Sequence, residues 1–311
     1  MKNRDNKQNQ NQDSDKYHVA VLLQSTIESL NIKPGNWYID CTLGGGGHAG
    51  EILKCGGKVI GVDQDQDALD HVGKKLSKYI ENGSLILEKS NFNGILEIAQ
   101  KHKLPIQGIL FDLGISSHQI DGNDRGFSFQ TNEPLDMRMD PENQTTTAEN
   151  LVNDLSEREL YKILYKYGED PLSKKVSKAI VDYRRDKPIT KTKQLAELIN
   201  NLYQHTYSSF SRTHPATKTF QALRIAVNNE LENFKNALKQ AIKIIEPNGR
   251  IAVITFHSLE DRIAKREFIS WQEDGQGKTL SKKPIVAEKP ELQVNARSRS
   301  AKLRVFEKHE N

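Results

Sequence analysis

Short apolar runs that suit β-strands alternate with amphipathic helical patterns between residues 17 and 112. The pattern predicts strands at residues 37–40, 58–62, 85–87 and 106–111. It predicts helices at residues 21–30, 49–54, 67–78 and 94–102. Strands that alternate with helices at this spacing form right-handed βαβ units, so we expect an α/β fold with a parallel sheet.

The alternation stops after residue 118 and resumes near residue 222. Helical patterns with almost no strand signal fill the interval, at residues 160–167, 172–183 and 193–203. They predict an inserted all-helical domain over residues 119–221. A helix at 223–245, a strand at 250–256 and a C-terminal hairpin with a strand around 302–306 then complete the expected sheet.

These patterns predict a discontinuous sheet domain made of residues 17–118 and 222–311. Residues 1–16 consist mainly of Asn, Gln, Asp and Lys without apolar periodicity. Such a segment cannot offset the entropy of ordering, so we expect it to be disordered.

Four consecutive glycines follow the first expected strand, in the segment Asp40-Cys41-Thr42-Leu43-Gly44-Gly45-Gly46-Gly47-His48. Glycine lets the backbone approach a ligand closely, and a helix start presents free N–H groups. A dinucleotide loop places a pyrophosphate there, which the Asp40 carboxylate would repel. S-adenosylmethionine (SAM), with its sulfonium and ammonium groups, fits better. NAD remains open on the spacing, as does a flexible turn without a ligand.

Asp63 ends the second strand, where nucleotide-binding sheets place an acid that accepts hydrogen bonds from ribose hydroxyls. The alternative is that Asp63 caps the following helix. His48 follows the glycine loop closely enough to contact a ligand, or bonds to backbone at the helix start. Phe92, after the third strand, belongs either to the core or to a stack on an adenine.

Asp112 leaves the fourth strand in the segment Asp112-Leu113-Gly114-Ile115-Ser116-Ser117. No cysteine lies here, which argues against thiolate attack on a pyrimidine ring and favours transfer to an amine or hydroxyl. A carboxylate orients an exocyclic amine and accepts its proton. We therefore interpret Asp112 as a catalytic residue, with a capping or cofactor-binding role as the alternative.

Aromatic and basic residues follow in Arg125-Gly126-Phe127-Ser128-Phe129. An aromatic pair beside an arginine suits an unstacked base, or simply anchors a loop. His257 starts a helix after the fifth expected strand and is expected at the same rim as Asp112.

Composition narrows the setting. The chain carries a formal net charge of +4. Residues 281–311 contain eight basic and four acidic side chains, so their net charge equals that of the whole chain. This tail is a candidate phosphate-binding surface. Cys41 and Cys55 give neither a zinc spacing nor a disulfide framework, so no metal site is expected. No apolar run is long enough for a membrane span or signal peptide, and we expect a cytoplasmic protein.

Several motifs in this order closely resemble the bacterial small-subunit ribosomal RNA methyltransferase H family, from about His18 to Phe306. The resemblance rests on the segments already quoted at 40–48, 112–117 and 125–129, and on Val62-Asp63, Pro134 to Asp140, Tyr167-Gly168-Glu169, His214 to Arg224, Phe256 to Arg262 and Arg297 to Arg304.

Membership would imply a class I (Rossmann-like) methyltransferase sheet with an inserted helical domain. It would imply methyl transfer from SAM to N4 of a cytidine in the decoding region of 16S rRNA, within the small ribosomal subunit. By resemblance the cofactor contacts fall on Gly46, Gly47, His48, Asp63, Phe92, Asp112 and Gln119.

Two other functions stay open: an NAD-dependent oxidoreductase and a non-catalytic ribosome assembly factor. The sequence does not fix the oligomeric state and leaves a homodimer open. For the ring that holds the cytosine, Phe127 and Phe129 are our candidates.

Overall fold

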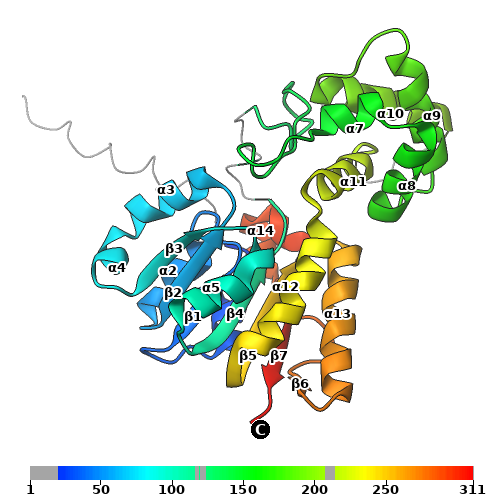
Figure 1. Ribbon diagram of the computed structural model, residues 1–311. Helices are drawn as coiled ribbons and strands as arrows, with labels where there is room; N and C mark the ends of the chain where they lie inside the picture. Colours follow the sequence, from blue (N-terminus) through cyan, green and yellow to red (C-terminus); the bar gives the residue numbers. More distant parts are fainter. Residues whose placement is uncertain (1–19, 116–118, 120–123, 207–213, 311) are drawn as a thin grey trace, which may run out of the picture.

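A computed structural model describes residues 20–115, 119, 124–206 and 214–310. The segment 1–16, expected to be disordered, and Ser116-Ser117 lie outside the described residues. The sheet has seven strands in the order β3-β2-β1-β4-β5-β7-β6 (Figure 1). Their bounds are Trp37–Asp40 (β1), Lys58–Asp63 (β2), Leu85–Lys89 (β3), Ile106–Asp112 (β4), Ile245–Thr255 (β5), Gly277–Thr279 (β6) and Lys302–Lys308 (β7).

The first five strands are parallel, and only β7 runs antiparallel to its neighbours β5 and β6. Ile39 of β1 pairs with Ile60 of β2 and with Ile109 of β4, so apolar residues line up across the sheet centre. The expected parallel sheet and C-terminal strand are confirmed. All carboxyl ends of β1 to β5 therefore meet at one edge.

Helices cover both faces of the sheet and bury two apolar clusters. One face packs against α5 (Ile95–His102), α12 (Glu230–Ile244) and α13 (Ser258–Glu273). The other packs against α1 (Leu23–Leu30), α2 (Gly47–Lys54) and α3 (Gln66–Lys75). The short helices α4 (Ser77–Glu81) and α14 (Lys289–Val294) also pack residues against the second cluster. Because adjacent strand residues point to opposite faces, Ile39 enters the first cluster and Tyr38 the second.

A third apolar cluster holds a group of helices that lies apart from the sheet in Figure 1. They are α7 (Ala148–Asp154), α8 (Glu157–Gly168), α9 (Ser173–Arg184), α10 (Thr192–Thr206) and α11 (Thr217–Asn228). A Cβ on Gly168 would lie 2.9 Å from the carbonyl oxygen of Lys218, so glycine lets α8 approach α11. Residues 222 and 223 belong to this cluster, although the predicted boundary falls at 221. The domain division stays a prediction, which the separate cores support.

Two expected helices are each divided in the structure. Asn229 has φ +49° and separates α11 from α12 where we expected one helix over 223–245. Asparagine tolerates this left-handed conformation, and the apolar pattern continues on both sides, so periodicity alone did not reveal the break. The expected helix 67–78 likewise breaks at Leu76.

Arg125 ties the segment after β4 to the end of β2. Its Nη1 donates to Asp65 at 2.7 Å, and Nη2 donates to the carbonyl oxygens of Arg138 and Met139 at 3.1 and 2.9 Å. The side chains of Arg125 and Asp65 are only 10% and 7% exposed. This ion pair is therefore shielded from solvent.

Arg125→Ala is expected to lower the free energy of unfolding by about 3–5 kcal/mol, because it leaves the buried Asp65 carboxylate without its cationic partner. Chemical denaturation measures this difference. Arg185→Ala is the control, since Arg185 is 71% exposed and pairs at the surface with Asp182; about 0.5 kcal/mol or less is expected there. Equal losses in the two variants would contradict the role of the buried pair.

Candidate active site

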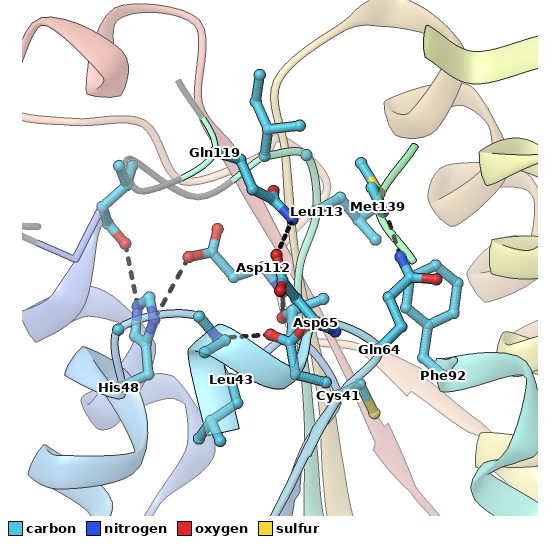
Figure 2. Close-up of a pocket in the computed structure, with 18 of the residues that line it drawn as sticks. Cys41, Leu43, His48, Gln64, Asp65, Phe92, Asp112, Leu113, Gln119 and Met139 are labelled. Atoms are coloured by element: carbon cyan, nitrogen blue, oxygen red, sulfur yellow. Dashed lines mark hydrogen bonds and ion pairs between the residues drawn. The ribbon is translucent and has the colours of Figure 1, made fainter. Parts of the chain in front are cut away.

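A cavity of about 260 Å³ opens at the carboxyl ends of the parallel strands. Every one of the five parallel strands contributes residues near its end, and Figure 2 shows several of these side chains converging on one space. Of the predicted site residues, the cavity is lined by Gly47, His48, Asp63, Phe92, Asp112 and Gln119. Gly46 is the exception. A Cβ on Gly46 would lie 2.9 Å from a methyl group of Val72, so this glycine faces α3.

The glycine loop is shaped by close backbone contacts. Gly44 and Gly46 have φ values of +47° and +70°, which side-chain-bearing residues rarely adopt. A Cβ on Gly47 would lie 2.9 Å from the Cβ of Ala20. The loop therefore brings bare backbone to the cavity at the start of α2.

Asp40 does not act as the sequence suggested. It is 1% exposed and lies outside the cavity lining, and its carboxylate accepts hydrogen bonds from the N–H groups of Thr42, at 3.2 Å, and Ala49. Burial, followed in effect by the charge of Asp63, raises the pKa of Asp40 to about 7. Asp40 therefore holds the loop from beneath, and the expected direct repulsion of a pyrophosphate by its side chain was wrong.

Asp63 faces the cavity from the end of β2 and also fixes the loop. Its Oδ2 accepts from Gly44 N–H and its Oδ1 from Asp65 N–H, both at 2.9 Å. Asp65, rather than Asp63, caps α3 by accepting from Asp67 N–H. The capping alternative for Asp63 is thus wrong. Burial raises the pKa of Asp63 to about 6, against the lowering effect of these hydrogen bonds.

Gln119 reaches the cavity by pairing with Asp65. Its Nε2 donates to Asp65 Oδ2 at 3.0 Å (Figure 2), and the same oxygen also accepts from Arg125. Asp65 was absent from the expected site. The only local signal was the run of polar residues after Asp63.

His48 lies between the start of the described chain and Asp112. Its Nε2 donates to the carbonyl oxygen of Val21 at 3.1 Å, and its Nδ1 lies 3.5 Å from Asp112 Oδ2 (Figure 2). The ring is 5% exposed. His48 therefore bonds to the backbone and also lines the cavity. The structure thus agrees with the expected backbone bond and leaves the side chain placed for the expected ligand contact.

Asp112 has one carboxylate oxygen that no described residue satisfies. Its backbone N–H donates to Thr42 Oγ1 at 2.6 Å, and Oδ2 faces His48, whereas the buried Oδ1 accepts no hydrogen bond from the described part of the chain. Burial raises the pKa of Asp112 well above its usual range, and the charges of Asp40 and Glu260 raise it further, while Arg297 opposes them. A buried acceptor left open in a cavity points to a ligand that donates to it.

The aromatic residues divide differently from our expectation. Phe127 is buried in the third apolar cluster. Phe129 stacks on His214, with ring centroids 4.7 Å apart, and meets Phe220 edge-on. Neither ring lines the cavity, so the structure favours the alternative in which both rings anchor a loop. The aromatic rings that line it are Phe92 at the β3 end and Phe256 at the β5 end.

Three further cavity residues were missed because they come from distant segments. Arg224 lies on α11, and Arg297 and Ser300 lie in or just after a short 3-10 helix at Ala296–Arg299. Their positions depend on long-range packing, which local patterns do not reveal. Arg297 was noticed only as part of a basic tail.

The described residues contain no cluster of three His, Cys, Asp or Glu side chains arranged for a metal ion. Nor does any helix in the described ranges have the length and apolar character of a bilayer span.

Sequence comparison decides the family of the chain. A profile of the MraW methylase family matches residues 15–309. The chain belongs to this family. It is 43% identical over 316 residues to a ribosomal RNA small subunit methyltransferase H from Brevibacillus brevis, covering 94% of this chain and 98% of that protein. A protein of the same name from Oceanobacillus iheyensis is 46% identical over 310 residues, with 94% of each chain covered.

As a member of the MraW methylase family, the protein is a methyltransferase that uses SAM, and its strand order with one antiparallel strand is the expected class I arrangement. The oxidoreductase alternative is thereby set aside. The shape and charge of the cavity also suit SAM, independently of the family assignment. Bare glycine backbone lines the cavity, and the carboxylates of Asp63 and Asp112 face it with Asp40 behind them. This negative surrounding suits a ligand with a sulfonium and an ammonium group.

The affinity for SAM is expected to rise by about tenfold between pH 5.5 and 7.5. A pKa of about 6 keeps Asp63 largely protonated at pH 5.5 and ionised at pH 7.5, and a cation binds better once this carboxylate is ionised. S-adenosylhomocysteine, which lacks the sulfonium charge, should show a shallower rise. Titration calorimetry in buffers of different ionisation enthalpy measures both slopes and the protons released. Equal slopes for the two ligands would contradict a charge-based preference.

Proposed function

We propose that the protein transfers a methyl group from SAM to the N4 amine of a cytidine in the decoding region of 16S rRNA, acting in the cytoplasm on the small ribosomal subunit. The observation that carries the proposal is the unsatisfied Oδ1 of Asp112 in the cavity. An exocyclic amine is a donor that such an oxygen accepts. The names of the relatives support ribosomal RNA of the small subunit as the substrate.

Gly47, His48, Asp63, Phe92 and Gln119 would hold the donor at the β1 to β3 end of the cavity, with Asp112 at its inner limit. SAM supplies an electrophilic methyl group on a positively charged sulfur. N4 of cytosine forms a bond to the methyl carbon while the carbon–sulfur bond breaks, and that electron pair stays on sulfur as a neutral thioether. N4 must also lose one proton.

Asp112 serves the amine in two ways. The lone pair of a cytosine amine is delocalised into the ring, and a hydrogen bond to Oδ1 favours the pyramidal geometry that makes N4 nucleophilic. The carboxylate then takes the proton. Because burial raises the pKa of Asp112, it is a stronger base than an exposed aspartate.

The helical region and the basic C-terminal segment are the parts of the chain proposed to hold the rRNA. Residues 281–311 carry an excess of positive charge, which suits contacts with phosphates. The helices α7 to α11 have their own apolar core and deliver Arg224 to the cavity. We therefore assign substrate recognition to residues 119–221 together with the rest of α11.

The test is methyl transfer from labelled SAM to small ribosomal subunits that lack the modification, followed by nucleoside analysis of the product by mass spectrometry. N4-methylcytidine is expected. A methyl group on C5 or on the ribose would overturn the amine assignment. A non-catalytic assembly factor would instead support subunit maturation in cells when Asp112→Ala removes methylation.

A further inference from the structure

The cavity extends beyond Asp112 to the end of β5, where Gly114, Phe256 and Arg224 line it. Because β4 lies between β1 and β5, Asp112 stands between this region and the glycine loop. The features that suit the donor, namely the loop, Asp63 and Phe92, all follow β1 to β3. The β5 end therefore has space and side chains that donor binding does not account for.

The side chain of Phe256 packs against the second apolar cluster and also lines the cavity. Its backbone N–H donates to Glu260 Oε2 at 2.8 Å, and Glu260 is 2% exposed. Gly114 has φ +106°, and a Cβ there would lie 3.5 Å from Phe256 Cδ2. Any other residue at 114 would be strained and would place its side chain against the ring. Glycine keeps that surface accessible.

Arg224 presents a rigid donor to the same region. Its Nε and Nη2 each donate to Glu230 at 2.8 Å, and the side chain is 15% exposed. These two bonds fix the plane of the guanidinium group. They leave Nη1 without an acceptor among the described residues.

Resting on the function proposed above, we propose that Phe256, Arg224 and Gly114 beside Asp112 form the subsite for the acceptor cytosine. Phe256 packs on the pyrimidine ring, Asp112 Oδ1 accepts from the N4 amine, and Arg224 Nη1 donates to ring N3 or O2. Along its N4, N3 and O2 edge, cytosine presents one donor followed by two acceptors, which suits a carboxylate and a guanidinium group that line the same cavity. Uracil presents an acceptor in place of the amine and would oppose the Asp112 carboxylate. The subsite therefore selects cytosine as well as positioning it.

Phe256→Leu tests the subsite, since leucine keeps an apolar side chain but removes the aromatic face. Loss of one base–aromatic stack should lower kcat/KM for unmethylated small subunits by about tenfold to a hundredfold. The Kd for SAM, measured by calorimetry, should stay within about twofold of the wild type. A weakening of SAM binding as large as the loss in kcat/KM would overturn the proposal.

Tyr79→Leu is the matched control, because Tyr79 of α4 packs against the second apolar cluster, as Phe256 does, but lies outside both the cavity and the helical region. It should leave kcat/KM unchanged. Equal losses of kcat/KM in Tyr79→Leu and Phe256→Leu, or a fully active Phe256→Leu, would overturn the subsite.

A measurement on the wild-type protein avoids any effect of substitution on folding. Small subunits carrying 5-iodocytidine at the methylated position are irradiated in the complex, and the crosslinked peptide is sequenced. The peptide that contains Phe256 is expected, whereas one containing Phe127 and Phe129 would overturn the proposal. The position of the methyl group in the wild-type product tests the proposed function separately from the subsite. A methyl group found on another base would refute cytidine N4 transfer and the Arg224 contact, while Phe256→Leu still reports on the stack.

Discussion

Replacing Asp112 with alanine is expected to lower kcat for methyl transfer by about a hundredfold to ten-thousandfold, the range for a lost general base. The variant removes the open Oδ1 acceptor and the group that takes the proton from N4. SAM binding should weaken by only about tenfold, the value of one hydrogen bond to a charged group. Steady-state kinetics give kcat, and calorimetry gives the Kd for SAM.

The pH dependence separates a catalytic role for Asp112 from a structural one. Burial, together with the charges of Asp40 and Glu260, raises the pKa of Asp112, while Arg297 opposes them. His48 Nδ1 lies 3.5 Å from the same carboxylate. Only the ionised form accepts the proton, so wild-type kcat should increase as the pH rises through this elevated pKa.

Asp112→Asn is the matched variant, because the amide keeps the shape and one acceptor oxygen but does not titrate. It should retain more activity than alanine, and the rise of kcat with pH should disappear. An unchanged pH profile in Asp112→Asn would assign the titration to another group. Equal losses in kcat and in SAM affinity for Asp112→Ala would assign Asp112 to donor binding alone.

Local patterns were sufficient for the parallel strands and for several residues that line the cavity. Polar residues that end buried strands must meet at one edge of a parallel sheet, so Asp63, Phe92 and Asp112 could be placed together before any coordinates. The side chain of Asp40 could not be placed in this way. It ends β1 on a buried face and is used beneath the loop.

The acceptor side depends on contacts that sequence spacing does not encode. Arg224 and Arg297 reach the cavity from α11 and from the C-terminal segment, more than 100 residues after Asp112. The sequence alone does not distinguish three phenylalanines as candidates for stacking on the acceptor base, namely Phe127, Phe129 and Phe256. Only packing distinguishes them, because the first two fill the helical region and the third lies over Gly114.

Asp63→Ala is expected to weaken SAM binding by about a hundredfold, since it removes a charged acceptor of several hydrogen bonds. Gly44 N–H and Asp65 N–H occupy one position on each carboxylate oxygen. The backbone N–H of Gln64 also bonds to this carboxylate, so at least one of its four acceptor positions remains for a ribose hydroxyl. Asp67→Ala is the control, because Asp67 is exposed in the first turn of α3. It should bind SAM normally.

The contribution of the ribose contact can be isolated with S-adenosylhomocysteine and its 2′,3′-dideoxy analogue. Wild-type protein should prefer the diol by about tenfold or more, the value of hydrogen bonds to a charged acceptor. Asp63→Ala should lose most of this preference, because the group that reads the hydroxyls is gone. Thermal unfolding of the unliganded variants reports any loss of folding separately. A preference that survives in Asp63→Ala would restrict Asp63 to holding Gly44 and Asp65, and the ribose would then be bound by another group.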